Sequence, residues 1–168
     1  MVSIVGHVAL IALALLVPGT AHACSLIPPP DRVAGETDAA YSGRITAFYR
    51  DLYDGAERND WDRADSVFTA RVVGLVPNTL YGEPSTKAVL QPVRRLKGTL
   101  PRGKFVVRPV GASMCGGNGA DLVAAGKPGD LFVIYLAPGK PSEKTWIGGN
   151  SPANIHDSRV LALLAAQD

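Results

Sequence analysis

The chain has 168 residues and carries 17 Lys and Arg against 15 Asp and Glu, a formal net charge of +2. The basic residues are scattered and nearly balanced by acids. The composition therefore argues against a nucleic-acid-binding protein, which would concentrate positive charge on one face. The length suits one domain with room for a hydrophobic core.

Residues 1–23 have the pattern of a cleavable secretory signal peptide. An uninterrupted apolar run over residues 8–17 is followed by Pro18-Gly19 and then by the small-x-small sequence Ala21-His22-Ala23. The apolar run is about half as long as the roughly 20 residues that cross a bilayer. We therefore expect export of the protein and no stable membrane span.

The predicted product is a secreted or periplasmic protein that begins at Cys24 and forms one domain over residues 24–168. Acylation of Cys24, which would make a lipid-anchored protein, is the alternative, although His22 fits that pathway poorly. Two cysteines in an exported chain favour one disulfide. A Cys24–Cys115 bond would close a loop of about 90 residues and stabilise the fold by roughly 4–5 kcal/mol. Free thiols and a metal site are the alternatives, and His156, the one mature histidine, makes a poor metal set with two cysteines.

The mature chain starts with a proline-rich segment that excludes helix and must be extended. A helix is predicted over residues 37–57, because apolar side chains recur there at helical spacing: Tyr41, Ile45, Phe48 and Leu52. Thr37 or Asp38 is the expected cap, and Gly55 lies near the expected end. A second, short helix is predicted over residues 156–166.

The region between the two helices is predicted to form strands. Its segments are rich in β-branched and aromatic residues: 66–76, 86–96, 104–110, 130–136 and a short fifth at 144–147. Turn residues separate the segments, including Pro77-Asn78 and residues 82–84. Pro92 and Pro109 indicate bulges or sheet edges.

Five strands with a helix or two indicate a mainly β domain with flanking helices, folded as a small antiparallel barrel. A parallel fold would need a helix between successive strands, and the gaps are too short for that.

Signatures of catalysis are sparse. One mature histidine and the lack of a Gly-x-Ser-x-Gly turn leave little for a hydrolase triad. Cys115 with His156 as its base is a possible nucleophile pair, but a structural disulfide is favoured. An acidic run lacks the glycine and closing glutamate of a calcium loop and is interpreted as a solvated helix end: Asp54, Glu57, Asp60, Asp62 and Asp65. We expect no enzyme activity, no cofactor and no intrinsic metal site.

Several short segments, in order, resemble the tissue inhibitors of metalloproteinases and the related netrin modules. Cys24-Ser25-Leu26-Ile27-Pro28-Pro29 is similar to the family's mature start, although Leu26 stands where the family has a further cysteine. Ser113-Met114-Cys115-Gly116 is similar to the family's Ser-Val-Cys-Gly. Residues 64–73, 96–98 and 129–135 resemble strand signatures of bacterial relatives. The resemblance implies a five-stranded OB-type barrel with helices packed on it.

In the animal inhibitors, the α-amino group and carbonyl oxygen of the first residue chelate the catalytic zinc of the target protease. The resemblance therefore implies that Cys24 is the chelator and that Ser25 enters the specificity pocket. It further implies that Ser113 and Met114 line neighbouring subsites beside a Cys24–Cys115 bond. The expected partner is an extracellular or periplasmic metalloprotease. The alternative is an OB-like domain that binds a protein, a glycan or an envelope component through its barrel face.

Overall fold

The computed structural model describes residues 27–111 and 119–166, which form an antiparallel sheet and flanking helices. The helices and strands follow in chain order as α1 (Asp38–Arg63), β1 (Ser66–Leu80), β2 (Glu83–Lys97), β3 (Phe105–Val107), α2 (Ala120–Ala124), β4 (Leu131–Leu136), β5 (Trp146–Asn150), the 3₁₀ turn η1 (Pro152–Asn154) and α3 (Ser158–Ala165). The predicted combination of a five-stranded antiparallel sheet with flanking helices is confirmed.

The strands lie in the order β3-β2-β1-β4-β5, and every neighbouring pair is antiparallel. The central strand β1 pairs with β2 along nearly its whole length and with β4 only from Ser66 to Arg71. β3 and β5 are the two edges of the sheet. Within residues 27–111 and 119–166 no backbone pairing joins these edges, so the hydrogen-bonded ladder is open there.

Both faces of the sheet bury apolar side chains. Successive residues of a strand point to opposite faces, so the apolar runs in the strands supply both. One face buries Phe68, together with alternate residues of β2 and β4, beneath the short helix α2. The opposite face buries Val67 and Tyr135 against Ile155 and Val160, which lie in the segment that leads through η1 into α3. The sheet therefore has two cores, and α1 and α3 cover the second one.

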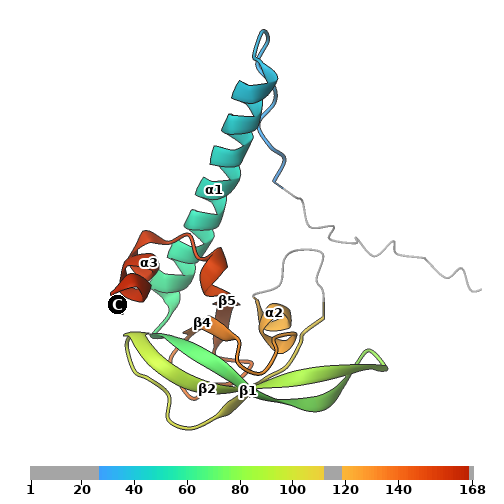
Figure 1. Ribbon diagram of the computed structural model, residues 1–168, viewed down its shortest axis with the longest axis vertical. Coiled ribbons are helices and arrows are strands. Elements are labelled where there is room, and N and C mark those ends of the chain that lie inside the picture. The colour runs from blue at the N-terminus through green and yellow to red at the C-terminus, as the bar shows by residue number, and fades with distance from the viewer. Residues whose placement is uncertain (1–26, 112–118, 167–168) are drawn as a thin grey trace, which may run out of the picture.

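The β1–β2 hairpin is longer than predicted and extends beyond the other strands (Figure 1). The turn predicted at Pro77-Asn78 is wrong, because Pro77 lies within β1 opposite Thr86. The chain reverses at Tyr81 and Gly82, whose φ angles of 52° and 85° suit the tight type I′ turn of two-residue hairpins. A proline is tolerated in this part of β1 because β4 pairs only with its first half.

The bulge predicted at Pro92 is confirmed. Successive residues Thr69 and Ala70 of β1 pair with Arg94 and Pro92, so β2 contains one extra residue at this point. Bulges of this kind increase the local twist of a strand.

Helix α1 begins as predicted, with the Thr37 hydroxyl accepting a hydrogen bond from the Ala40 amide at 3.3 Å. It does not end near Gly55, however, but continues to Arg63. The Lys97 ammonium group at the end of β2 donates to the carbonyl oxygens of Trp61 and Ala64, both at 2.6 Å. This cation satisfies carbonyl groups that have no partner within the last helical turn, and it therefore stabilises the longer helix.

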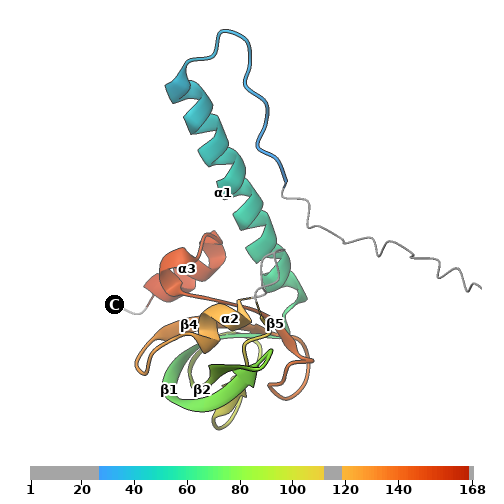
Figure 2. The ribbon, with the colours of Figure 1, turned by 90° about the vertical axis from the view of Figure 1, so that its right-hand side faces the viewer.

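The helix α1 projects from the sheet, and only its second half lies against the domain (Figures 1 and 2).

The C-terminal helix α3 starts two residues later than predicted, with Asp157 as its N-cap. None of the helices in the described ranges is both long enough and apolar enough to cross a membrane.

Candidate functional site

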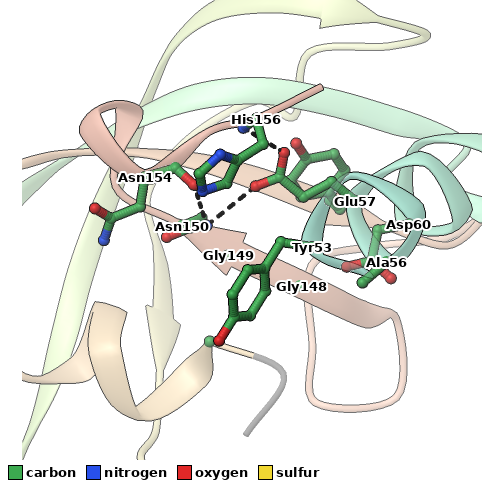
Figure 3. A pocket seen from close by; sticks show the side chains of 11 residues that line it. Tyr53, Ala56, Glu57, Asp60, Gly148, Gly149, Asn150, Asn154 and His156 are labelled. Atoms are coloured by element: carbon green, nitrogen blue, oxygen red, sulfur yellow. Dashed lines mark hydrogen bonds between the residues drawn. The ribbon is translucent and has the colours of Figure 1, made fainter. Parts of the chain in front are cut away.

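A cleft of about 460 Å³ lies between the second half of α1 and the chain from β5 to the start of α3. Its volume is within the range of about 300–1,000 Å³ that is usual for small-molecule sites. Figure 3 shows side chains from α1 on one side and from the β5–η1 segment on the other. The lining residues are Tyr53, Ala56, Glu57, Asp60, Gly119, Tyr135, Gly148, Gly149, Asn150, Asn154 and His156.

The carboxylate of Glu57 joins the two sides of this cleft. One of its oxygens, Oε2, accepts hydrogen bonds from the backbone amides of His156 and Asp157, both at 2.7 Å. The other oxygen accepts from the Asn150 side-chain amide at 3.3 Å (Figure 3). Glu57 is buried, and its partners lie roughly a hundred residues further along the chain. A buried carboxylate that accepts this many hydrogen bonds is a structural anchor of α1.

A second set of contacts holds α3 to α1 beside the cleft. The Arg159 guanidinium pairs with Asp157 at 2.6 Å and with Asp62 at 3.0 Å. The two carboxylates raise the pKa of Arg159, and Arg159 in turn lowers the pKa of Asp157, against the opposing effect of burial. Asp157 also caps α3 by accepting from the Arg159 amide at 2.8 Å. The start of α3 is therefore linked to α1 by ionic contacts next to the cleft.

Two tyrosine side chains line the cleft, one exposed and one buried. The Tyr53 ring is stacked on the His156 ring, with the centroids 6.0 Å apart and the planes 19° from parallel. Tyr53 is 56% exposed, whereas Tyr135 from β4 is only 2% exposed. The Tyr135 hydroxyl is buried and has no hydrogen-bond partner in the described part of the chain. Burial, followed by the negative charges of Glu57 and other acids, raises the pKa of Tyr135, so its hydroxyl remains protonated.

Asp60 is the second acid of the cleft. Burial raises the pKa of its carboxyl group, the charge of Arg63 lowers it, and the charge of Glu57 raises it further. No hydrogen bond or ion pair of the Asp60 side chain is formed within residues 27–111 and 119–166. The cleft therefore contains two carboxylates. Glu57 is hydrogen-bonded within the protein, and Asp60 is available to a ligand.

Two glycines in the lining of the cleft allow α2 to lie close to β5. Gly119, with a φ of +75°, lies so close to Gly149 that a side chain on Gly119 would collide with the Gly149 carbonyl group. A side chain on Gly149 would come within 2.7 Å of the Trp146 ring and 2.9 Å of Val123. Close packing of α2 on β5 therefore requires glycine at both positions.

The site residues predicted from the sequence are Cys24, Ser25, Ser113 and Met114, with Cys115 as the disulfide partner of Cys24. All of them lie outside the described residues, and so does the predicted signal peptide at residues 1–23. Residues 27–111 and 119–166 contain no group of three or more His, Cys, Asp or Glu side chains placed to hold a metal ion.

The interpretation of the acidic run as a solvated helix end is wrong for three of its members. Glu57 is buried and Asp54 and Asp60 are partly buried, whereas Asp62 and Asp65 are exposed. For Glu57 and Asp60 the error follows from ending the helix at residue 57. On a helix that continues to Arg63, Tyr53, Glu57 and Asp60 have the spacing i, i+4, i+7 and share one face. That polar stripe was the available signal for the cleft.

Comparisons of the chain with protein-family models, with curated proteins and with solved structures found no match.

Proposed function

We propose that this chain is an exported, non-catalytic binding module of the metalloprotease-inhibitor and netrin type. The observation that carries the proposal is the arrangement of five antiparallel strands around a core shared by both edge strands. Phe105 of β3 and Trp146 of β5 pack against the same apolar cluster. A sheet whose two edges meet over one core is what a partly open OB-like barrel requires. Barrel closure and membership of the OB class belong to the proposal.

The binding role is supported by the contacts of Glu57, one of the two carboxylates of the cleft. A general base must be free to accept a proton from a bound substrate. Both oxygens of Glu57 instead accept hydrogen bonds from the protein, two of them from backbone amides. The carboxylate is therefore suited to holding the cleft together, and a binding function uses this arrangement better than a proton-transfer function.

The proposed inhibitory mechanism starts from the resemblance at Cys24. Signal-peptide removal would free an α-amino group whose ordinary pKa is about 7.7–8.0, so a neutral fraction could bind zinc near pH 7. A Cys24–Cys115 bond would hold that amine in position and reduce the entropy lost on docking. Ser25, Ser113 and Met114 would contact the neighbouring subsites of the protease.

The described residues that follow this segment are compatible with such a contact. Ile27 and Val33 are 52% and 61% exposed, and residues 27–33 are in neither a helix nor a strand. Apolar side chains that are already exposed can be buried by a partner without disturbing the core.

The decisive experiment compares protein that begins at Cys24 with protein that carries one additional alanine before Cys24. Both forms are assayed against a panel of purified zinc metalloproteases, and a form with one additional alanine after Asp168 is the control. We expect inhibition by the first form and by the control, and none by the N-terminally extended form. Equal inhibition by all three forms would rule out zinc chelation by the amine.

Intact mass before and after reduction tests the state of Cys24. A chain that starts at Cys24 and gains two hydrogens on reduction has the predicted cleavage and disulfide. The mass of a diacylglyceryl group would instead identify a lipid-anchored protein and exclude the disulfide at Cys24.

The cleft supports a second candidate function, in which the domain binds a protein or a glycan without using the N-terminal amine. Tyr53, Asp60 and the amides of Asn150 and Asn154 provide an aromatic ring, a carboxylate and amide groups on one concave surface. Binding that is unchanged by the additional alanine before Cys24 would favour this function over inhibition.

A further inference from the structure

The cleft between α1 and β5 is acidic, whereas the chain as a whole carries a small positive charge. The charged side chains in its lining are Glu57 and Asp60, and the described residues that line it include neither Lys nor Arg. Acidic side chains alone do not define a binding site, because water solvates them. Three further features of this cleft indicate the kind of group that it binds.

The first feature is Tyr135. Its side chain is 98% removed from solvent, lines the cleft, and has a hydroxyl without a hydrogen-bond partner in the described residues. A buried hydroxyl that is left unpaired costs about 1–3 kcal/mol. Because the hydroxyl is neutral, its oxygen lone pairs can accept a hydrogen bond from a donor that enters the cleft.

The second feature is the pair of stacked rings at the rim. Tyr53 is exposed, and its ring is stacked on that of His156. Figure 3 shows Tyr53 reaching across the cleft in front of Gly148 and Gly149. A tyrosine ring presents a negative face that attracts cations at distances up to about 6 Å.

The third feature is the free carboxylate of Asp60. It shares the cleft with the Glu57 charge, and burial disfavours its ionised form. A positive charge placed between the two acids would stabilise the ionised form of Asp60, because attraction between opposite charges increases as water is excluded. Arg63 offsets part of the cost of burial, and a cation bound in the cleft would offset more of it.

We propose that this cleft binds an ammonium or guanidinium group, with Asp60 as its counter-ion, the Tyr135 hydroxyl as an acceptor, and Tyr53 as a cation–π wall. The group is carried either by a small alkylamine or by a Lys or Arg side chain of a partner protein. The inference requires no residue outside 53–156 and is independent of zinc chelation at Cys24. Loss of inhibition after N-terminal extension would therefore leave it intact.

A neutral sugar is the main competing occupant, because sugar sites also combine rings, amides and carboxylates. The two occupants differ in their need for charge. A cation depends on the negative charge of Asp60, whereas a sugar hydroxyl can hydrogen-bond to the amide of an asparagine at that position. Asp60→Asn therefore separates them.

The experiment is a titration followed by NMR, using isotope-labelled protein and n-butylammonium chloride as the probe. The matched control ligand is n-butanol, which has the same alkyl chain and no charge. We expect saturable shifts of the side-chain amides of Asn150 and Asn154 with n-butylammonium and none with n-butanol. Shifts of equal size with n-butanol, or with glucose, would overturn the proposal.

Three variants test the assigned roles, and thermal unfolding verifies that each of them is folded. Asp60→Asn should weaken binding of n-butylammonium at least about tenfold, the effect of losing one charge-assisted hydrogen bond. Tyr135→Phe should weaken it about threefold, because only a neutral acceptor is lost. Asp51→Asn, an exposed change on the same helix, should bind as the parent protein does. Unchanged affinity in Asp60→Asn would contradict the proposal.

A final pair of ligands identifies the source of the cation. The peptide acetyl-Gly-Lys-Gly-amide is compared with a peptide in which norleucine replaces lysine. Tighter binding of the lysine peptide than of n-butylammonium assigns the cleft to a partner's side chain, and weaker binding assigns it to a free amine. Equal binding of the lysine and norleucine peptides would refute recognition of a cation.

Discussion

The two halves of helix α1 are held in different ways, although they form one continuous helix of 26 residues. The first half contacts mainly the preceding segment. Arg44 pairs with Glu36 at 2.8 Å and donates to the Asp31 carbonyl at 2.7 Å, and its guanidinium lies 5.5 Å from the centre of the Tyr41 ring. The second half contacts residues that are far away in the sequence, through the Glu57 carboxylate and through the cap that Lys97 provides.

This difference shows which contacts fix the position of the helix on the domain. Ion pairs near the surface, like those of Arg44, contribute little because water screens them. Buried acceptors like Glu57 contribute more, because their donors would be left unpaired without them. The second half is therefore part of the domain and forms a wall of the cleft, whereas the first half is an arm attached to it.

The largest expected effect is that of Glu57→Ala. It leaves the amides of His156 and Asp157 without their acceptor, so the free energy of unfolding should fall by about 3 kcal/mol. Chemical denaturation measures this loss, and Glu143→Ala, at an exposed position, is the matched control. A loss no greater than that of the control would show that Glu57 does not anchor α1.

Lys97→Met should have the next largest effect. It removes the hydrogen bonds to the carbonyl groups of Trp61 and Ala64, and the expected loss is about 2 kcal/mol. Amide hydrogen exchange should accelerate over residues 60–64. Lys104→Met, at an exposed lysine, should change neither quantity. If α1 still ended at Arg63 with full protection, the proposed role of Lys97 would be wrong.

Asp157→Ala should cost about 1 kcal/mol at pH 7, because α3 loses its N-cap. The Asp157 pKa is lowered in the folded state, chiefly by Arg159, so the carboxylate stabilises the fold fully above its ordinary pKa of about 3.9. This contribution is lost as the pH falls through the lowered pKa. Denaturation of both proteins between pH 7 and pH 2 should therefore give free energies that converge below about pH 4. A difference that persists to the lowest pH would contradict the assignment.

Arg44→Ala should lower the melting temperature by less than about 4 °C, as expected for a partly buried ion pair at the protein surface. Its effect should be local, with faster amide exchange over residues 38–44 and no change over residues 53–63. Slower or faster exchange in the second half would mean that the two halves are coupled.

Asp60→Asn is expected to leave stability unchanged or to raise it slightly. Because the folded-state pKa of Asp60 is raised, its ionised form opposes folding, and this cost disappears as the pH falls through that pKa. The parent protein should therefore gain stability relative to Asp60→Asn on acidification. A variant clearly less stable than the parent at pH 7 would mean that Asp60 has a structural role.

The strands were predictable because a high content of β-branched and aromatic residues, bounded by turn residues, is a local signal. In the sheet, Phe68 and Ile134 face one core while Val67 and Tyr135 face the other. The length of the β1–β2 hairpin was not predictable, since Pro77-Asn78 has the composition of a turn. Only the pairing with β2 makes that segment a strand.

The cleft was missed for a related reason. The residues after Gly55 are mostly polar and continue no apolar stripe, so the sequence pattern gave no reason to extend the helix. The helix continues because Lys97 and residues 150–157 bind it, and these partners are 33 to 100 residues away in sequence. The sequence-based hypothesis about Cys24 and Ser113 concerns residues outside the described ranges and stays a prediction.

The most direct test of this account is amide hydrogen exchange along α1, measured with and without n-butylammonium. We predict that residues 53–63 exchange at least about tenfold more slowly than residues 39–50, because only the second half is anchored to the domain. Addition of n-butylammonium should slow exchange over residues 53–63 further and leave residues 39–50 unchanged. Uniform exchange along the helix that n-butylammonium does not alter would contradict both the anchored second half and the cation-binding cleft.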